Sequence, residues 1–319
     1  MRSAFAAALA LAVAAPLAAQ AKPAPSAPVD SVVLRFAWPI GLEAEMQYTQ
    51  VIDREGDAAE PTHIEIEGQY TMHVHDHAQG LLVEFLDPVA VRYRASPELP
   101  PDDPRRVVYS TLGVPIPDYI VSKTDGRLLG VQGLDALHQA IAEIVQRQAP
   151  GSDVDRVLGQ LADPDQLLNA AKERWTNQVT DWVGAVLRAG EVGGGEGREA
   201  NPILPALSVP YQFEFKLNGI EPCAAPAGQC VRVEVSQFYD AEALNKTMND
   251  ALGQMGITNF SFDGLVEESR MILLTDPTTL LTYQMDMTKG VEGILKQDGQ
   301  SRAFRRTDQL SLDFEYTKR

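Results

Sequence analysis

The chain has 319 residues and a formal net charge of −17 at pH 7, with 44 acidic against 27 basic residues. Because so acidic a surface repels nucleic acid and anionic membranes at long range, we expect no nucleic-acid partner. The length of the chain is enough for one large domain or two modest ones, each with a proper core.

Residues 1–21 have the pattern of a cleavable signal peptide. Arg2 gives a positive start, an alanine- and leucine-rich core follows, and Ala19-Gln20-Ala21 forms a small-residue cleavage site. We expect cleavage after Ala21, a periplasmic or secreted product, and no transmembrane segment in the mature chain. Residues 22–30 alternate proline with alanine and serine, which predicts an extended tether before a single domain at 31–319.

Alternating apolar and polar residues predict strands along the first part of this domain. In the longest predicted strand, residues 62–77, even positions from Ile64 to Val74 point inward and odd positions point outward. Asp125-Gly126 predicts a hairpin turn between two further strands. The other strands expected here cover residues 31–37, 42–49, 81–85, 89–94, 106–110, 119–123 and 127–131.

Residues 133–190 are predicted to form a helical insert. Its main element is an amphipathic helix over 163–190, about 39 Å long, that begins with Asp163-Pro164 and ends at Gly190. Two tryptophans, Trp175 and Trp182, lie on its apolar stripe, so the helix should cover a large surface. The glycine-rich run at 193–197 is interpreted as a hinge or linker.

Strands resume after the insert, with one helix expected after Asp240 and ending at Gly256. The two strand blocks on either side of the insert predict an α+β fold. We expect a large, curved, mainly antiparallel β-sheet, half-barrel-like, with the central helical insert packed on it. The strands expected in the second block cover residues 211–217, 231–235, 257–262, 265–274, 280–287 and 310–316.

The two cysteines, Cys223 and Cys230, are close in sequence and are predicted to form a disulfide at a hairpin tip. By the chain-entropy model, so short a loop contributes roughly 2.5 kcal/mol. Such a disulfide supports export to an oxidising compartment more than it indicates a metal-binding or redox function.

His73, His75 and His77 project from one face of a predicted strand and are the candidate metal ligands. The alternative is an exposed polar strand end. No cofactor is expected.

An apolar cavity between the bent sheet and its covering helices is the candidate ligand site, with methionines such as Met248 as adaptable walls. The alternative is that the same side chains form an ordinary helix–sheet core. The candidate lining residues are Trp175, Val179, Trp182, Tyr211, Phe213, Phe215 and Met285.

Catalytic signatures do not stand out in the sequence: it contains no G-x-S-x-G elbow, and a disulfide would consume both thiols. No catalytic residue is therefore predicted. The favoured function is a non-catalytic exported protein that binds an apolar ligand or an envelope partner. The alternatives are a structural or interaction protein with a filled core, or a hydrolase with no recognisable sequence signature.

The signal peptide, long alternating strands, helical insert and a late Asp276-Pro277-Thr278-Thr279-Leu280 strand–turn–strand segment together resemble uncharacterised secreted bacterial proteins. The architecture is also similar to that of half-barrel lipoprotein and lipid carriers of the bacterial envelope. This resemblance implies helices that cap a curved antiparallel sheet and a carrier function, and it maps no functional residue onto the chain.

Overall fold

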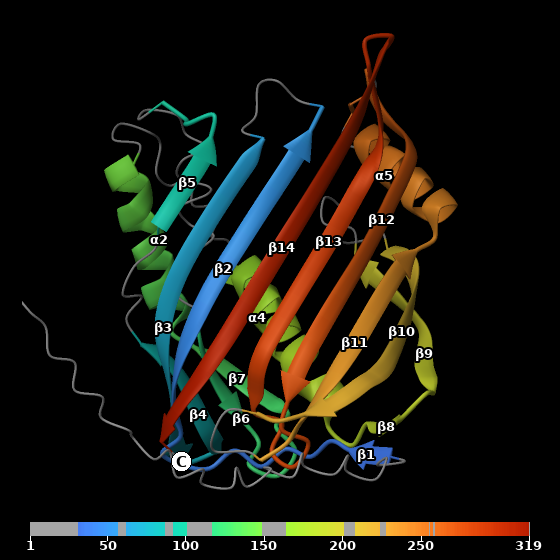
Figure 1. Ribbon diagram of the computed structural model, residues 1–319. Helices are drawn as coiled ribbons and strands as arrows, with labels where there is room; N and C mark the ends of the chain where they lie inside the picture. Colours follow the sequence, from blue (N-terminus) through green and yellow to red (C-terminus); the bar gives the residue numbers. More distant parts are fainter. Residues whose placement is uncertain are drawn as a thin grey trace, which may run out of the picture.

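A computed structural model describes residues 31–56, 62–86, 92–100, 117–148, 164–200, 208–223, 228–254, 256–257 and 259–318. Its main feature is a large antiparallel sheet, twelve-stranded within these ranges, that curves without closing into a barrel (Figure 1). The predicted fold class is therefore confirmed. The predicted strand at 106–110 and the predicted cap Asp163 lie outside the described residues.

The two halves of the chain meet in the middle of this sheet, where the first long strand pairs with the last. The strand order is β7-β6-β4-β3-β2-β14-β13-β12-β11-β10-β9, with β5 also paired to β3. The N-terminal strands are β2 (Glu43–Glu55), β3 (His63–His77), β4 (Gly80–Leu86), β5 (Arg92–Ser96), β6 (Asp118–Val121) and β7 (Leu128–Gln132). The C-terminal strands are β9 (Val192–Ala200), β10 (Ser208–Glu221), β11 (Cys230–Tyr239), β12 (Phe260–Thr275), β13 (Thr282–Gln297) and β14 (Gln300–Lys318).

The concave face of the sheet carries the apolar positions, as the alternation predicts. In β3 the even residues Ile64, Ile66 and Tyr70 are buried, whereas their odd neighbours are more exposed. The strands β13 and β14 are longer than predicted and turn at Asp298-Gly299, where both residues have positive φ. Consecutive positive φ angles are typical of the tight hairpin turn that an Asp-Gly pair favours.

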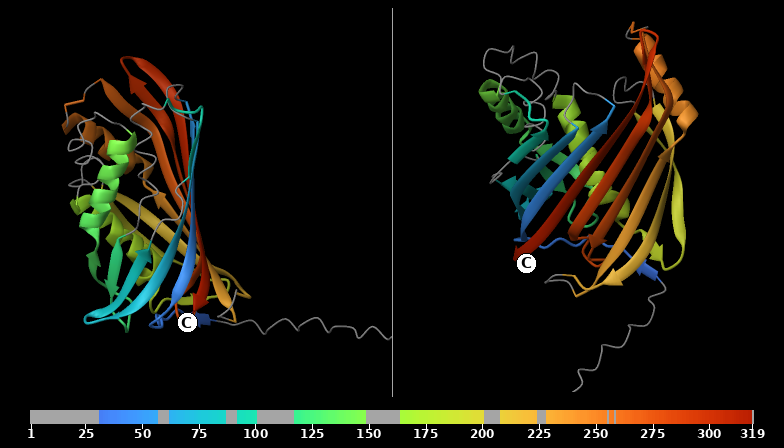
Figure 2. Two further views of the ribbon diagram at one scale, coloured as in Figure 1. Left: turned by 90° about the vertical axis from the view of Figure 1, so that its left-hand side faces the viewer. Right: turned by 45° about the horizontal axis from the view of Figure 1, so that its top comes forward.

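The helices α2 (Leu134–Gln148) and α4 (Pro164–Gln178) lie on the concave side of the sheet (Figure 2). Trp175 anchors α4 because its side chain is only 1% exposed and its ring lies 5.1 Å from that of Tyr119 and 5.4 Å from that of Trp38. Its indole Nε1–H donates a hydrogen bond of 2.7 Å to the carbonyl of Gly126, in the predicted Asp-Gly turn. The insert is thus fixed to the sheet by both packing and a buried hydrogen bond.

The long helix predicted over 163–190 is wrong in its second half. It begins at Pro164 as expected but ends at Gln178, which makes it about 22 Å long at 1.5 Å per residue. Val179 leaves the helical region with φ −131°, a single 3₁₀ turn follows at Thr180–Trp182, and Gly184 takes φ +81°. Trp182, in the 3₁₀ turn, is buried and lies edge-on against Phe215 of β10.

The glycine-rich run at 193–197 is also not a linker, because it forms part of β9 at the edge of the described sheet. Every second glycine lies opposite an aromatic residue of β10, so that Gly193 pairs with Phe215 and Gly195 with Phe213. A Cβ atom built on Gly193 would lie 2.3 Å from Cζ of Phe215. The glycines therefore leave room for aromatic rings that lie across the strand, a packing known to compensate for glycine in sheets.

One end of the concave face is crossed by the segment that follows β1 (Ser31–Val33). β1 pairs with β8 (Val186–Arg188), and the chain then bonds to the turn between β12 and β13. The amide of Arg35 donates to the carbonyl of Pro277, and Nε1 of Trp38 donates to that of Leu280. We call residues 34–38 the strap. It ties the turn that was predicted at Asp276-Pro277 to the helical insert.

Replacing Gly193 by alanine should lower the free energy of unfolding by about 1–3 kcal/mol, because the new methyl group overlaps the Phe215 ring. Gly219→Ala is the matched control, since Gly219 lies in the neighbouring strand with no atom within 4 Å of the added carbon. Urea unfolding of both variants measures the difference. Equal stabilities would contradict the packing of rings over glycine.

Trp175→Phe should lower the free energy of unfolding by about 1–3 kcal/mol, because the carbonyl of Gly126 loses its buried donor. Trp175→Ala should cost more, about 3–5 kcal/mol, since it also removes most of the buried ring. Chemical denaturation followed by circular dichroism tests both values. An unchanged Trp175→Phe variant would show that the hydrogen bond does not hold the helix.

Candidate functional site

The helix α5 (Ala241–Gln254) lies at the end of the sheet away from the strap (Figure 1). A cavity of about 630 Å³ lies beside it, lined in part by its residues Leu244 and Met248. We call it the α5 cavity. Its volume falls within the range of about 300–1,000 Å³ typical of small-molecule sites. Its apolar and aromatic lining residues are Val209, Tyr239, Leu244, Met248, Phe260, Phe262, Leu265, Val291, Leu295 and Phe304. Its remaining lining residues are Arg54, Glu55, Gly56, Glu267, Lys289, Arg302, Arg305, Arg306 and Asp308.

The helix α5 is fixed over this cavity by hydrogen bonds to the backbone of β12. The helix starts where predicted, because the carboxylate of Asp240 accepts a 2.7 Å hydrogen bond from the amide of Ala243. The side-chain amide of Asn245 both donates to and accepts from the backbone of Leu265, at 2.9 Å each. One turn later, the side-chain amide of Asn249 does the same with Phe262, at 2.9 and 2.8 Å.

These two asparagines hold the helix at a place where the sheet is irregular. The pairing of β12 with β13 shifts register between Asp263 and Val266, and Gly264 has φ +59°. Such a bulge frees backbone groups from the ladder, and the asparagine amides satisfy them. The apolar residues of α5, Leu244 and Met248, are thereby placed over the cavity.

The apolar wall of the cavity is formed by inward-facing residues of β12, β13 and β14. Phe262 lies 5.4 Å from Phe260 and 6.1 Å from Phe304, measured between ring centroids. Leu265 is 3% exposed, and Val291 packs against the same group. This small cluster is separate from the main core beneath α4.

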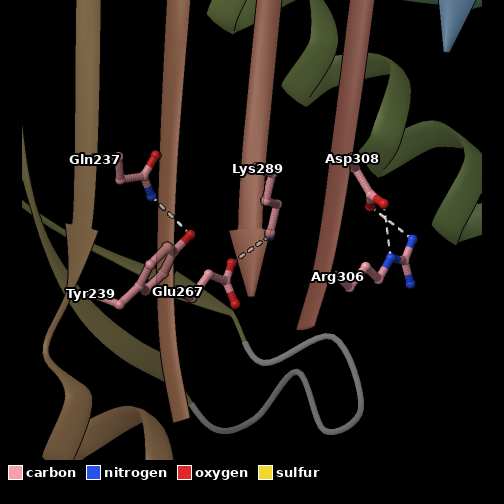
Figure 3. Close-up of polar contacts among 6 residues, drawn as sticks. All are labelled: Gln237, Tyr239, Glu267, Lys289, Arg306 and Asp308. Carbon is pink, nitrogen blue, oxygen red and sulfur yellow. Dashed lines mark hydrogen bonds and ion pairs between the residues drawn. The ribbon is translucent and has the colours of Figure 1, made fainter. Parts of the chain in front are cut away.

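A group of polar side chains lies between this wall and the main core, and Figure 3 shows it rising from four neighbouring strands. We call it the polar band; it consists of Gln237, Tyr239, Glu267, Lys289, Arg306 and Asp308. Two residues nearer the strap than Gln237, Lys289 and Asp308 lie the apolar residues Val235, Met287 and Leu310, and Met271 of β12 is in register with Val235 and Met287.

Each member of the polar band has a partner within it. The ammonium of Lys289 lies 2.5 Å from Oε1 of Glu267, and Nε2 of Gln237 donates to the hydroxyl of Tyr239 at 2.8 Å. The guanidinium of Arg306 donates two hydrogen bonds to the carboxylate of Asp308, at 2.8 and 2.7 Å. This fork-like geometry is the one in which Arg binds carboxylates most specifically.

The seven ligand-cavity candidates chosen from sequence do not line the α5 cavity. Trp175, Val179, Trp182 and Met285 are at most 6% exposed and belong to the main core. The aromatic candidates of β10 (Tyr211, Phe213 and Phe215) lie over the glycines of β9, and Phe215 also packs edge-on against Trp182 at 6.4 Å. Only Met248, proposed as an adaptable wall, lies where the cavity is.

The structure does not bring the three candidate metal ligands together around one point. The rings of His73 and His75 lie 5.7 Å apart, and Nε2 of His75 contacts Glu84 at 2.8 Å. Nδ1 of His77 accepts a hydrogen bond from the amide of Gln79 instead. Within the described part of the chain, no three His, Cys, Asp or Glu side chains are arranged to hold a metal ion.

Burial raises the pKa of three aspartates, but none of them lines the α5 cavity. Desolvation is the main cause for Asp118, Asp181 and Asp313, and the charge of Asp286 adds to the rise at Asp313.

The predicted Cys223–Cys230 disulfide is present, with the two Cα atoms 5.3 Å apart beside the β10–β11 pair.

Sequence reasoning missed this site in part because the strands predicted at 280–287 and 310–316 stopped short of it. The alternation at Leu310, Leu312 and Phe314 continues backward through Arg302, Phe304, Arg306 and Asp308, where charged residues occupy inward positions. The Asp298-Gly299 hairpin signal could have extended both strands to this end of the sheet.

Comparisons with known proteins do not assign the chain to a family. No protein-family model matches it, and no curated protein sequence matches it. Among solved structures, one of lipovitellin, described as concerning lipid–protein interactions, aligns with 87% of this chain at 10% identity and a TM-score of 0.37. The chain spans only 25% of the length of that lipovitellin chain.

A second solved structure, the Pseudomonas aeruginosa protein OccK5 (OpdH), aligns with 88% of this chain and 99% of its own, at 9% identity and a TM-score of 0.20. Similarities at this level carry no functional assignment. Among the helices in the described ranges, none has both the length and the apolar character needed to cross a membrane.

Removing the ammonium group of Lys289 should destabilise the protein through Glu267, whose side chain is only 15% exposed. We expect Lys289→Met to lower the free energy of unfolding by about 1–3 kcal/mol, because a partly buried carboxylate loses its partner. The double variant Glu267→Met with Lys289→Met should recover much of that loss, as a matched apolar pair. Urea denaturation of the single and double variants measures this; equal losses would contradict a coupled pair.

Proposed function

We propose that this chain is an exported, non-catalytic protein that binds an apolar or amphiphilic ligand in the α5 cavity. The observation that carries the proposal is the cavity itself, about 630 Å³ in volume and walled by ten apolar or aromatic side chains. Well-formed apolar pockets with a few convergent polar groups are the usual form of small-molecule sites.

The surroundings of the cavity support binding more than a filled structural core. Below the polar band, the sheet and α4 pack a continuous core that leaves Leu273 and Leu312 fully buried. Above it, the residues of the second cluster leave space between α5 and the sheet. Met248 lies in this wall and can adapt to ligands of different shape because its side chain is unbranched and flexible.

Export and periplasmic localisation form part of the same proposal. They rest on the signal-peptide pattern of residues 1–21, which lie outside the described residues, and agree with the disulfide. The placement of the three raised-pKa aspartates away from the cavity favours binding over acid–base catalysis there.

A bulky substitution at a residue of the cavity wall tests the proposal, because the larger side chain would occupy the space that a ligand needs. Val291 faces the cavity from β13, so Val291→Trp should exclude a ligand. Val266 is 43% exposed and does not line the cavity, so Val266→Trp is the matched control. The probe is N-phenyl-1-naphthylamine, a neutral dye whose fluorescence rises in apolar surroundings. We expect Val291→Trp to weaken dye binding roughly tenfold or more and Val266→Trp to leave it unchanged.

Thermal unfolding of both variants verifies that they fold. Two results would overturn the proposal: no saturable dye binding by the unmodified chain, or equal binding by Val291→Trp and Val266→Trp.

A further inference from the structure

A groove separate from the α5 cavity lies between β7 and α4, which are neighbours in the structure (Figure 1). Its volume is about 500 Å³, and we call it the β7 groove. None of the residues that line it also lines the α5 cavity. The β7 groove therefore has no part in the ligand site proposed above.

One wall of the groove is the backbone edge of β7 rather than a face of the sheet. The consecutive residues 127–131 all line it. Because successive side chains of a strand point to opposite faces, a groove that touches each of these residues runs along the edge of the strand. In the described sheet β7 pairs only with β6, so the hydrogen-bonding groups on its other edge are not used by a neighbouring strand.

The opposite wall is one face of α4. Leu168, Lys172 and Thr176 follow one another at four-residue steps along this helix, and Thr180 of the next turn continues the row. The hydrogen bond from Trp175 to Gly126 fixes the helix to the turn that precedes β7. A groove between a strand edge and a fixed helix is suited to an extended peptide that adds a strand to the sheet.

The backbone of β7 is accessible at its centre. Gly130 is the middle residue of the strand, and a Cβ atom built on it would have one neighbour within 4 Å, Cδ1 of Ile120 at 3.8 Å. Glycine inside a strand often marks a place where another backbone approaches closely. The strand is about 16 Å long at 3.3 Å per residue, so a short peptide segment is enough to pair with it.

A hydroxyl group in the helix-side wall lacks a hydrogen bond. Oγ1 of Thr180 is buried and has no hydrogen-bond partner within the described part of the chain. Buried polar groups are nearly always hydrogen-bonded in folded proteins. An unpaired hydroxyl in the wall of a groove thus points to a bound group that supplies the bond, and a peptide backbone carries both donors and acceptors.

The groove is basic, although the chain as a whole has a net charge of −17. Its charged lining residues are Arg127 and Lys172, and no described Asp or Glu lines it. Asp125 lies close to Arg127, since its carboxylate accepts a hydrogen bond from the amide of Arg127. Lys172 is exposed and forms no ion pair with any described residue. The groove thus offers an acidic partner a local attraction that the rest of the surface lacks.

We infer that the β7 groove binds an extended acidic segment of a partner protein. The segment pairs with β7 as an additional strand and places a carboxylate beside Lys172. A second copy of this chain is the less favourable occupant, because pairing of β7 with β7 would bring together the Lys172 and Arg127 side chains of both copies. The inference is independent of the ligand proposed for the α5 cavity.

The test measures the binding of short synthetic peptides to the whole mature chain by isothermal titration. One peptide alternates glutamate with valine, and a second alternates lysine with valine. A third repeats the first with the amides of its two central residues N-methylated, which blocks both edges of the strand. We expect saturable binding of the acidic peptide, and binding of the other two that is weaker by about tenfold or more. Added salt should weaken the acidic peptide.

Substitutions then locate the peptide. Lys172→Gln should weaken the acidic peptide roughly threefold to tenfold. Lys246→Gln is the matched control, because Lys246 lies on α5 and pairs with Asp250 outside the groove. Thr176→Trp should fill the groove and abolish binding, whereas Asn169→Trp, at an exposed residue of α4 outside the groove, should not. Circular dichroism verifies that each variant folds.

Several outcomes would overturn the inference. These are no saturable binding of the acidic peptide, equal binding of the lysine or N-methylated peptide, or binding that survives both Lys172→Gln and Thr176→Trp. Displacement of the peptide by an equal concentration of free glutamate would assign the groove to a small anion instead. Dimerisation of the chain that Thr176→Trp abolishes would assign the strand edge to a second copy. Dye binding in the α5 cavity should be the same in all these variants.

Discussion

The structure depends on removing the apolar face of a bent antiparallel sheet from water. An antiparallel sheet can leave one face solvated, but the other needs a cover. Here Trp175 provides the anchor for that cover, since it packs against Trp38 and Tyr119 and donates its indole N–H to Gly126. The strap then closes the same end of the face.

The two ends of the concave face are covered in different ways, and only one is filled. Beneath α4, large side chains from the helix and sheet interdigitate into a continuous core. At the other end, α5 is attached through Asn245 and Asn249, whose amides bond to the backbone of β12. Because these bonds fix the helix without requiring its apolar face to touch the opposite strands, a cavity remains beside it.

The polar band is the boundary between these two regions, and it departs from the simple alternation of the sheet. Charged residues occupy inward positions at Lys289, Arg306 and Asp308, where the pattern along each strand leads one to expect apolar residues. Such departures cost stability unless the charges are paired, and they tend to occur at functional sites. Arg54 on β2 is a further inward-facing charged residue, directly opposite Arg306 in the register of the sheet.

The sequence by itself determined the local elements, because period-two alternation and turn residues act over a few neighbouring positions. It predicted the inward face of β3, the Asp125-Gly126 turn, the cap at Asp240 and the disulfide. Only the tertiary structure decided that β2 pairs with β14, because strand order depends on contacts between residues far apart in the chain. The strand at Gly193 was decided in the same way, by aromatic rings on another strand. The α5 cavity could not be predicted for this reason: its walls come from strands whose neighbours are fixed only when the whole sheet has formed.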